Sequence, residues 1–87
     1  MTDKLVREIA KLAEIMRLAA QYRPGQTFEL EGWKLRVIDI DGPNEYRRYA
    51  MVDVEPLGKR IVPARAVATL DENGLHFRVP EGWRNEF

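Results

Sequence analysis

Two pairs of carboxylates are the residues of this chain best suited to chemistry. Asp39 and Asp41 lie two positions apart, as do Asp53 and Glu55. Residues two apart in an extended strand point to the same side, so each pair would share one face of a sheet. Two such acids can hold Mg²⁺ when a substrate completes the coordination shell. The pattern raises acid–base or metal-assisted catalysis as a first hypothesis.

The other groups that catalysis uses are scarce. The chain has no cysteine and no serine, and its three threonines (Thr2, Thr27 and Thr69) stand outside any nucleophile motif. The single histidine, His76, alternates with apolar residues, which predicts a solvated strand position rather than a general base. The six glycines are spaced as turns and element ends, not as a phosphate-binding loop. We therefore expect no catalytic residue, no metal site and no cofactor, and a protein that is not an enzyme.

A predicted hairpin explains the carboxylates. Residues 33–55 have turn formers at their centre and β-branched or aromatic residues in both arms, which predicts a loop at 42–45. The predicted pairs are Trp33 with Val54, Leu35 with Val52, Val37 with Ala50, Asp39 with Arg48, and Lys34 with Asp53. One face is then apolar, and Glu55 would likewise face Arg60 in the next turn. Acids that each face a base are typical of structural ion pairs, which argues against a catalytic role.

The outward side of the same hairpin interleaves arginine with aromatic and apolar residues. This candidate binding face comprises Lys34, Arg36, Ile38, Ile40, Arg47, Tyr49 and Met51, and Tyr46, Arg48, Lys59, Arg60 and Arg65 could extend it. Such a mixture suits base stacking and phosphate contact in RNA or DNA, and it suits a protein hot spot equally well. In the alternative interpretation, the helix covers Ile38 and Tyr49 while the arginines form ordinary surface pairs.

An amphipathic helix is predicted from residue 3 to about residue 22. Its apolar stripe, with 4-3-4-3 spacing, comprises Leu5, Ile9, Leu12, Met16 and Ala19. Neighbouring apolar residues widen the arc beyond the ~100° that packing on one sheet requires. This breadth could serve both the domain core and a partner or a second copy of the chain. Leu18 lies outside the arc and is a candidate partner contact.

Short strands follow as a meander. Residues 27–30 form the first strand, and the turn at Glu31-Gly32 places Leu30 opposite Trp33. Residues 67–70 and 75–79 form a later pair joined by a loop at 71–74, and a turn at 56–59 begins another hairpin between them. In the tail we expect Trp83 to fold back and Phe87 to be free, and both are candidate partner contacts.

These elements predict a single α+β domain over residues 1–87, with a helix at 3–22, a β-meander at 26–79 and a tail at 80–87. Five or six antiparallel strands of this kind curl strongly or close into a small barrel of the SH3, Sm or PRC type, because open edges invite aggregation. The helix would then plug an open end of the barrel or cover its outside.

Residues 60–83 carry a family resemblance. Val62-Pro63, Val67, Asp71, the strand 75–79 and Pro80-Glu81-Gly82 stand in the order found at the end of the PRC-barrel domain of ribosome maturation factors, which this segment resembles. The resemblance implies a small barrel and a docking role on a protein or ribonucleoprotein. The order of helix and strands is also similar to the Sm-like fold, although the polar signature by which that family binds RNA bases is missing.

Composition narrows the function further. Lys plus Arg and Asp plus Glu each number 14, so the net charge is zero and the usual basic signature of a nucleic-acid-binding domain is missing. No apolar run approaches the ~20 residues of a membrane span, and the lack of cysteine fits a reducing compartment, so we expect a cytoplasmic protein. The preferred prediction is a binding or assembly module with a protein partner or a homodimer, the alternative is an RNA- or DNA-binding protein, and an uncharacterised enzyme is a distant third.

Overall fold

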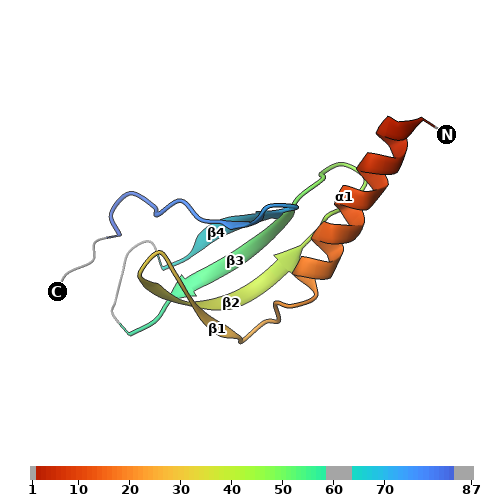
Figure 1. The fold of residues 1–87 in the computed structure, drawn as a ribbon. Helices are drawn as coiled ribbons and strands as arrows, with labels where there is room; N and C mark the ends of the chain where they lie inside the picture. The colour runs from red at the N-terminus through yellow and green to blue at the C-terminus, as the bar shows by residue number, and fades with distance from the viewer. Residues whose placement is uncertain (1, 59–63, 84–87) are drawn as a thin grey trace.

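The chain forms one helix followed by a curled antiparallel sheet (Figure 1). The computed structural model describes residues 2–58 and 64–83. The elements are α1 (Asp3–Ala19), β1 (Thr27–Leu30), β2 (Trp33–Asp41), β3 (Ala50–Pro56), β4 (Ala66–Asp71) and β5 (Gly74–His76). The strands pair in chain order with β1 and β5 at the two edges, and the sheet curls into a half-barrel (Figure 1). The predicted α+β class is confirmed.

Local signals account for the limits of α1. The Thr2 hydroxyl accepts a hydrogen bond from the Leu5 backbone N–H at 3.4 Å, which caps the first turn. Asp3 lies in the first turn and Arg17 in the last, where each charge complements the helix dipole. The helix ends at Ala19, three residues earlier than the predicted end, and turns then lead through Tyr22 to β1.

The β1–β2 hairpin has the predicted register. Leu30 faces Trp33, and Phe28 faces Leu35. Glu31 and Gly32 both have positive φ, at 51° and 83°, as the two central residues of a type I′ turn require. Because this turn matches the twist of the flanking strands, a two-residue signal was sufficient to predict the pairing.

The predicted register of the β2–β3 hairpin is wrong. Leu35 faces Pro56 instead of Val52, a shift of four residues, and the connection spans residues 42–49 instead of 42–45. An even shift keeps every side chain on its own face. The predicted inner face is therefore still correct, and its members Trp33, Leu35, Val37, Ala50, Val52 and Val54 are all buried.

A β-bulge in β2 changes the second half of that strand. The register slips between Val37 and Asp39, so that Asp39 faces Asp53 and Ile40 faces Val52. Ile40 consequently packs against the core, although the sequence placed it on the outward face. The predicted pair of Asp39 with Arg48 is also wrong, because Arg48 binds Glu8 instead.

The remaining strands complete the meander. β3 pairs with β4, with Val54 opposite Ala66, and β4 pairs with β5 around a two-residue turn at 72–73. The predicted hairpin between them, with Glu55 facing Arg60, falls on residues 59–63 and lies outside the described residues. β5 is shorter than predicted and ends at His76.

The core lies on the inner face of the sheet and has an aromatic end. The ring of Trp83 packs against Trp33 and Phe77, with centroid separations of 5.2 and 5.7 Å. Trp83 is only 6% exposed, so it folds back as expected and is not available as the partner contact that the sequence suggested. Phe87 lies outside the described residues.

Candidate docking surface

The helix packs on the sheet through a different side from the one predicted. Ile15 is 1% exposed and belongs to the core, and Leu18, Ala19 and Tyr22 pack beside it. Ile15, Leu18 and Ala19 lie within about 100° of one another on the helix circumference, and Tyr22 follows in the turn after the helix. Leu18 is therefore a core contact and not the predicted partner contact. The helix covers the inner face near β4, rather than the outside of the hairpin.

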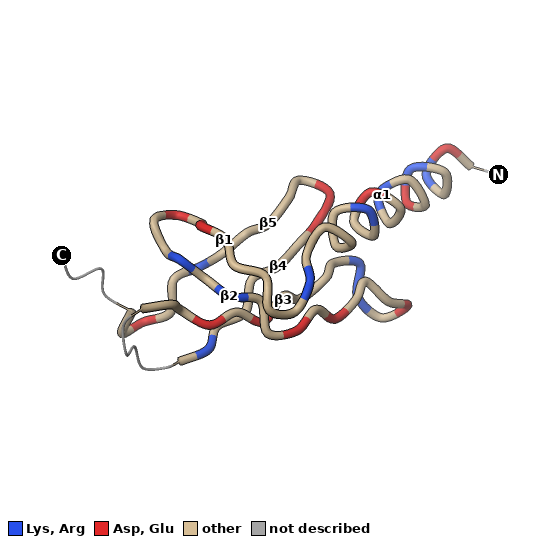
Figure 2. Tube along the Cα trace, turned by 90° about the horizontal axis from the view of Figure 1, so that it is seen from below, with Lys and Arg blue, Asp and Glu red and all other residues tan. Residues whose placement is uncertain are grey.

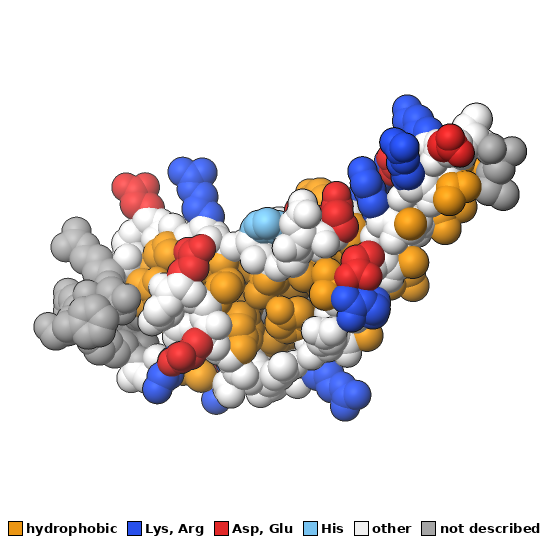
Figure 3. All heavy atoms as spheres, in the orientation of Figure 1, with side chains coloured by type: hydrophobic (Ala, Val, Ile, Leu, Met, Phe, Trp, Pro, Cys, Tyr) orange, Lys and Arg blue, Asp and Glu red, His pale blue; other side chains and the backbone are white. Residues whose placement is uncertain are grey.

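The predicted apolar stripe is left largely uncovered. Of the stripe, Leu5 is 50% exposed, Ile9 54% and Met16 62%, and the neighbouring Val6 is 52% exposed. The N-terminal half of α1 projects past the end of the sheet (Figure 1), and Figure 3 shows hydrophobic side chains along one edge of the projecting helix and charged side chains along the other. We call the residues Leu5, Val6, Ile9 and Met16 the exposed helix face.

This face is large enough to matter energetically. Fully burying a side chain of this size is worth about 1.5–3 kcal/mol. Each of the four is at least half exposed, so covering them would contribute roughly 4 kcal/mol per chain. Scattered single apolar residues are normal on protein surfaces, whereas these four lie together on one element.

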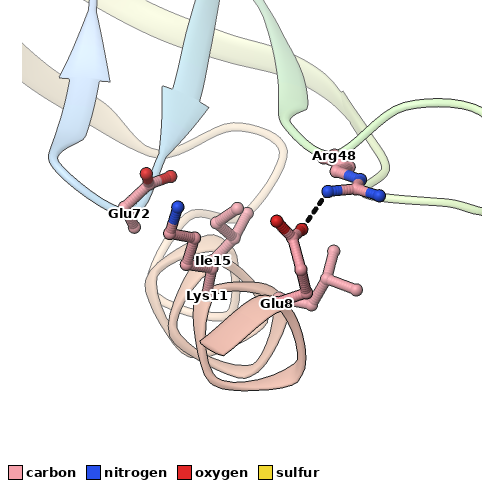
Figure 4. A pocket seen from close by; sticks show the side chains of 6 residues that line it. Glu8, Lys11, Ile15, Arg48 and Glu72 are labelled. Atoms are coloured by element: carbon pink, nitrogen blue, oxygen red, sulfur yellow. Dashed lines mark hydrogen bonds and ion pairs between the residues drawn. The ribbon is translucent and has the colours of Figure 1, made fainter. Parts of the chain in front are cut away.

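Core packing and one ion pair hold the projecting helix against the sheet. Ile15 inserts into the core, and about two turns closer to the N-terminus Glu8 accepts a hydrogen bond from the Arg48 guanidinium in the β2–β3 loop. Figure 4 shows this ion pair at the rim of a pocket that Lys11, Ile15 and Glu72 also line. The pocket measures about 160 Å³, which is less than the ~300 Å³ of a small ligand site. We therefore interpret it as the seam between helix and sheet.

Arg47 has a structural part in the β2–β3 loop. Its guanidinium donates to the Asp41 backbone oxygen at 2.8 Å, to the Asp41 carboxylate at 3.1 Å and to the Tyr49 backbone oxygen at 3.1 Å. It also lies 5.4 Å from the centre of the Tyr49 ring. These contacts close the eight-residue connection and leave the Arg47 side chain only 20% exposed. Nothing in the order of residues indicated this role, since the neighbouring Arg48 looks equivalent.

Replacing the two neighbouring arginines by methionine should separate these roles. Arg47→Met removes donors from two backbone oxygens and should lower the free energy of unfolding by about 1–2 kcal/mol. Arg48→Met removes one exposed ion pair with Glu8 and should cost less than ~1 kcal/mol. Urea denaturation of both variants beside the wild type measures the difference. Equal losses would contradict the assignment of Arg47 as the residue that closes the loop.

The candidate binding face from the sequence is divided in the structure. Lys34, Arg36 and Met51 lie on the outer side of the sheet, whereas Ile38 is half-buried at the bulge. Arg47 and Tyr49 belong to the loop. Of the suggested extension, Tyr46 and Arg65 are exposed, and Lys59 and Arg60 lie outside the described residues.

Acidic residues alternate with basic ones on the same outer side. Glu55 pairs with Arg36 at 3.1 Å, and Glu29 lies opposite Lys34. The tube in Figure 2 shows acidic and basic positions mixed along the strands rather than gathered by sign. Phosphate binding favours a patch of one sign. Nucleic-acid binding by this face stays a prediction.

The single histidine contacts a carboxylate at the surface. His76 Nε2 lies 2.9 Å from Asp71 Oδ1, and this hydrogen bond holds the pKa of Asp71 below its ordinary value. Both side chains are solvent-accessible, so we interpret the contact as a surface pair of small energetic weight. Within residues 2–58 and 64–83, no three acidic or histidine side chains converge on a position that could hold a metal ion.

No protein-family model, curated protein or solved structure matches this chain. The resemblance of residues 60–83 to the PRC barrel is neither supported nor opposed by that result and stays a prediction. Over the part of the chain that the structure describes, α1 is too short and too polar to cross a membrane.

Proposed function

We propose that this chain is a small, non-catalytic assembly module that docks on a protein partner through the exposed helix face. The observation that carries the proposal is the exposure of four large apolar side chains on one side of a helix whose other side is already anchored. A helix needed only for the domain core would not require a second apolar side. The lack of cysteine is compatible with such a module acting in the cytoplasm.

The spacing of the face supports a specific mode of recognition. Leu5, Ile9 and Met16 are separated by intervals of four and seven residues, so they form one row along the helix. Helices that dock on a partner use anchors at such intervals to fill an apolar groove or pack on another helix. Since α1 is already folded and attached to the sheet, little ordering of the chain would oppose binding.

Position-specific cross-linking in the cell that makes the protein tests the proposal. A photoreactive benzoylphenylalanine replaces Ile9 in one sample and Lys34, on the outer side of the sheet, in the other. We expect a covalent protein adduct from position 9 and not from position 34. Adding Met16→Asp to the position 9 sample should abolish the adduct, while adding Arg7→Ala on the charged side should leave it. The proposal fails if position 9 forms no more adduct than position 34, or if Met16→Asp has no effect.

A further inference from the structure

We infer that α1 is a lid on the half-barrel, which detaches from the inner face of the sheet and repacks on it as one unit while the strands stay folded. The lid turns about Ala20 and Gln21, which follow the last residue of the helix. It is a property of the single chain, so it holds whichever partner covers the exposed helix face.

Few contacts keep the lid closed. Ile15 is the one fully buried residue among those of α1 that the structure describes, and Leu18 and Ala19 are only partly buried beside it. Most of the buried core residues instead belong to β2, β3 and β4. A segment that contributes few buried apolar contacts opens at a lower free energy than the core of its domain. We therefore expect the helix to open before the sheet does.

One ion pair joins the lid to the rest of the domain. Among residues 2–58 and 64–83, the pair of Glu8 with Arg48 is the only hydrogen-bonded link between α1 and the strands or the loops between them. The Arg48 side chain is 71% exposed, and ion pairs of such exposure add little net stability and are screened by salt. Lys11 and Glu72 line the same seam from its two sides (Figure 4). Water can solvate all of these charged groups when the lid opens.

The connector after α1 can act as a hinge. Ala20 and Gln21 are exposed, whereas Tyr22 packs edge-on against Phe28 of β1, with ring centroids 5.8 Å apart. The backbone of Gly25 then donates a hydrogen bond to β2 at 2.8 Å. The chain is thus fixed to the sheet from Tyr22 onward. A change of backbone angles in the two exposed residues before it swings the helix without disturbing β1.

Opening exposes surfaces that the closed chain hides. Ile15, 1% exposed in the closed state, comes into contact with water, and the inner face beside β4, the main neighbour of α1 in the sheet, loses its cover. The detached helix has no tertiary support, and a free helix of 17 residues is only marginally stable in water. Its backbone amides therefore exchange with solvent whenever the lid is open.

Hydrogen exchange of the purified chain, at urea concentrations below the unfolding transition, gives the first test. We expect the amides of Ile15, Met16 and Leu18, in the anchored half of α1, to be protected at least about tenfold less than the most protected amides of β2 and β3. Their exchange should also depend less on urea, because opening the lid exposes less surface than unfolding the domain. Equal protection with equal urea dependence would overturn the lid, since helix and sheet would then open together.

Two variants with the same loss of charge separate the seam from the helix. Glu8→Gln removes the ion pair across the seam, and Glu14→Gln removes the ion pair of Glu14 with Arg17 within the helix. We expect Glu8→Gln to speed exchange at the Ile15 amide by about twofold to fivefold, and Glu14→Gln by less than about twofold. High salt should speed this exchange more in the wild type and in Glu14→Gln than in Glu8→Gln. An equal or larger effect of Glu14→Gln would overturn the lid, because the helix would then unravel in place.

The distance between helix and sheet gives a second readout. The chain has no native cysteine, so spin labels on Arg7→Cys and Asn73→Cys, both at exposed positions, report the distance between α1 and the β4–β5 turn. In the otherwise wild-type chain we expect one dominant distance. Ile15→Ala removes the main anchor, so a longer and broader distance should appear while the near-ultraviolet signal of the tryptophans persists. A distance unchanged by Ile15→Ala, or one that changes only together with loss of the tryptophan signal, would overturn the lid.

Discussion

Ile15→Ala should lower the free energy of unfolding by about 2–4 kcal/mol, whereas Ile9→Ala should change it by less than ~0.5 kcal/mol. Both residues are isoleucines in the same helix, and both substitutions remove the same atoms. Ile15 is 1% exposed within the core, and Ile9 is 54% exposed on the projecting half. The difference between the two variants therefore reports which side of α1 contacts the sheet.

The loss of stability expected from Ile15→Ala has a specific consequence for the helix. Among the α1 residues that the structure describes, Ile15 is the one that is fully buried, so its truncation removes the main anchor. A free helix of 17 residues is only marginally stable in water. We therefore expect Ile15→Ala to lose helical circular dichroism before the sheet unfolds.

Urea denaturation, carried out at one low micromolar concentration, measures both variants. The helical signal at 222 nm and the tryptophan fluorescence of the sheet are followed together. Equal destabilisation by the two substitutions, or a larger effect of Ile9→Ala, would mean that the helix packs through the stripe predicted from the sequence.

Trp83→Ala should cost about 3–5 kcal/mol, a large part of the roughly 5–10 kcal/mol expected for a domain of this length. Trp83 follows the last strand and closes one end of the inner face by packing on Trp33 and Phe77. Aromatic pairs at such distances add ~0.5–1.5 kcal/mol each to the effect of burial alone. Losing this side chain exposes both partners at once.

Near-ultraviolet circular dichroism gives a second readout for this variant. The indole rings of Trp33 and Trp83 have centroids 5.2 Å apart with an interplanar angle of 54°, so their transitions should couple. We expect the coupled signal to vanish in Trp83→Ala and to persist in Tyr46→Ala, because Tyr46 is 90% exposed in the β2–β3 loop. An unchanged signal and stability in Trp83→Ala would contradict the observed aromatic packing.

Much of the sheet follows from local patterns in the sequence. The turn at Glu31-Gly32 determines the β1–β2 register, because only a few residue pairs suit its backbone angles. The alternation of Trp33, Leu35 and Val37 identifies the inner face. That identification survives the wrong β2–β3 register because the shift is an even number of residues.

The site depended on information that no local pattern contains. Arg47 closes the loop at 42–49 by donating hydrogen bonds to the backbone oxygens of Asp41 and Tyr49. Every residue has a backbone oxygen, so residue types alone do not identify such partners. The bulge after Val37 moves Ile40 inward, and it occurs in the pairing of β2 with β3, which the residues of β2 alone do not specify. Both features altered the membership of the candidate binding face.

The sequence by itself determined that α1 is amphipathic and that its apolar arc is wider than one sheet can cover. It could not determine which part of that arc faces the sheet, because two adjoining sides of the helix are comparably apolar. The tertiary structure decided this through the shape of the half-barrel, whose inner face accommodates Ile15 and Leu18. Leu5, Val6 and Ile9 face solvent on the half of α1 that projects past the sheet, and Met16 faces solvent because it lies about 100° around the helix from the buried Ile15.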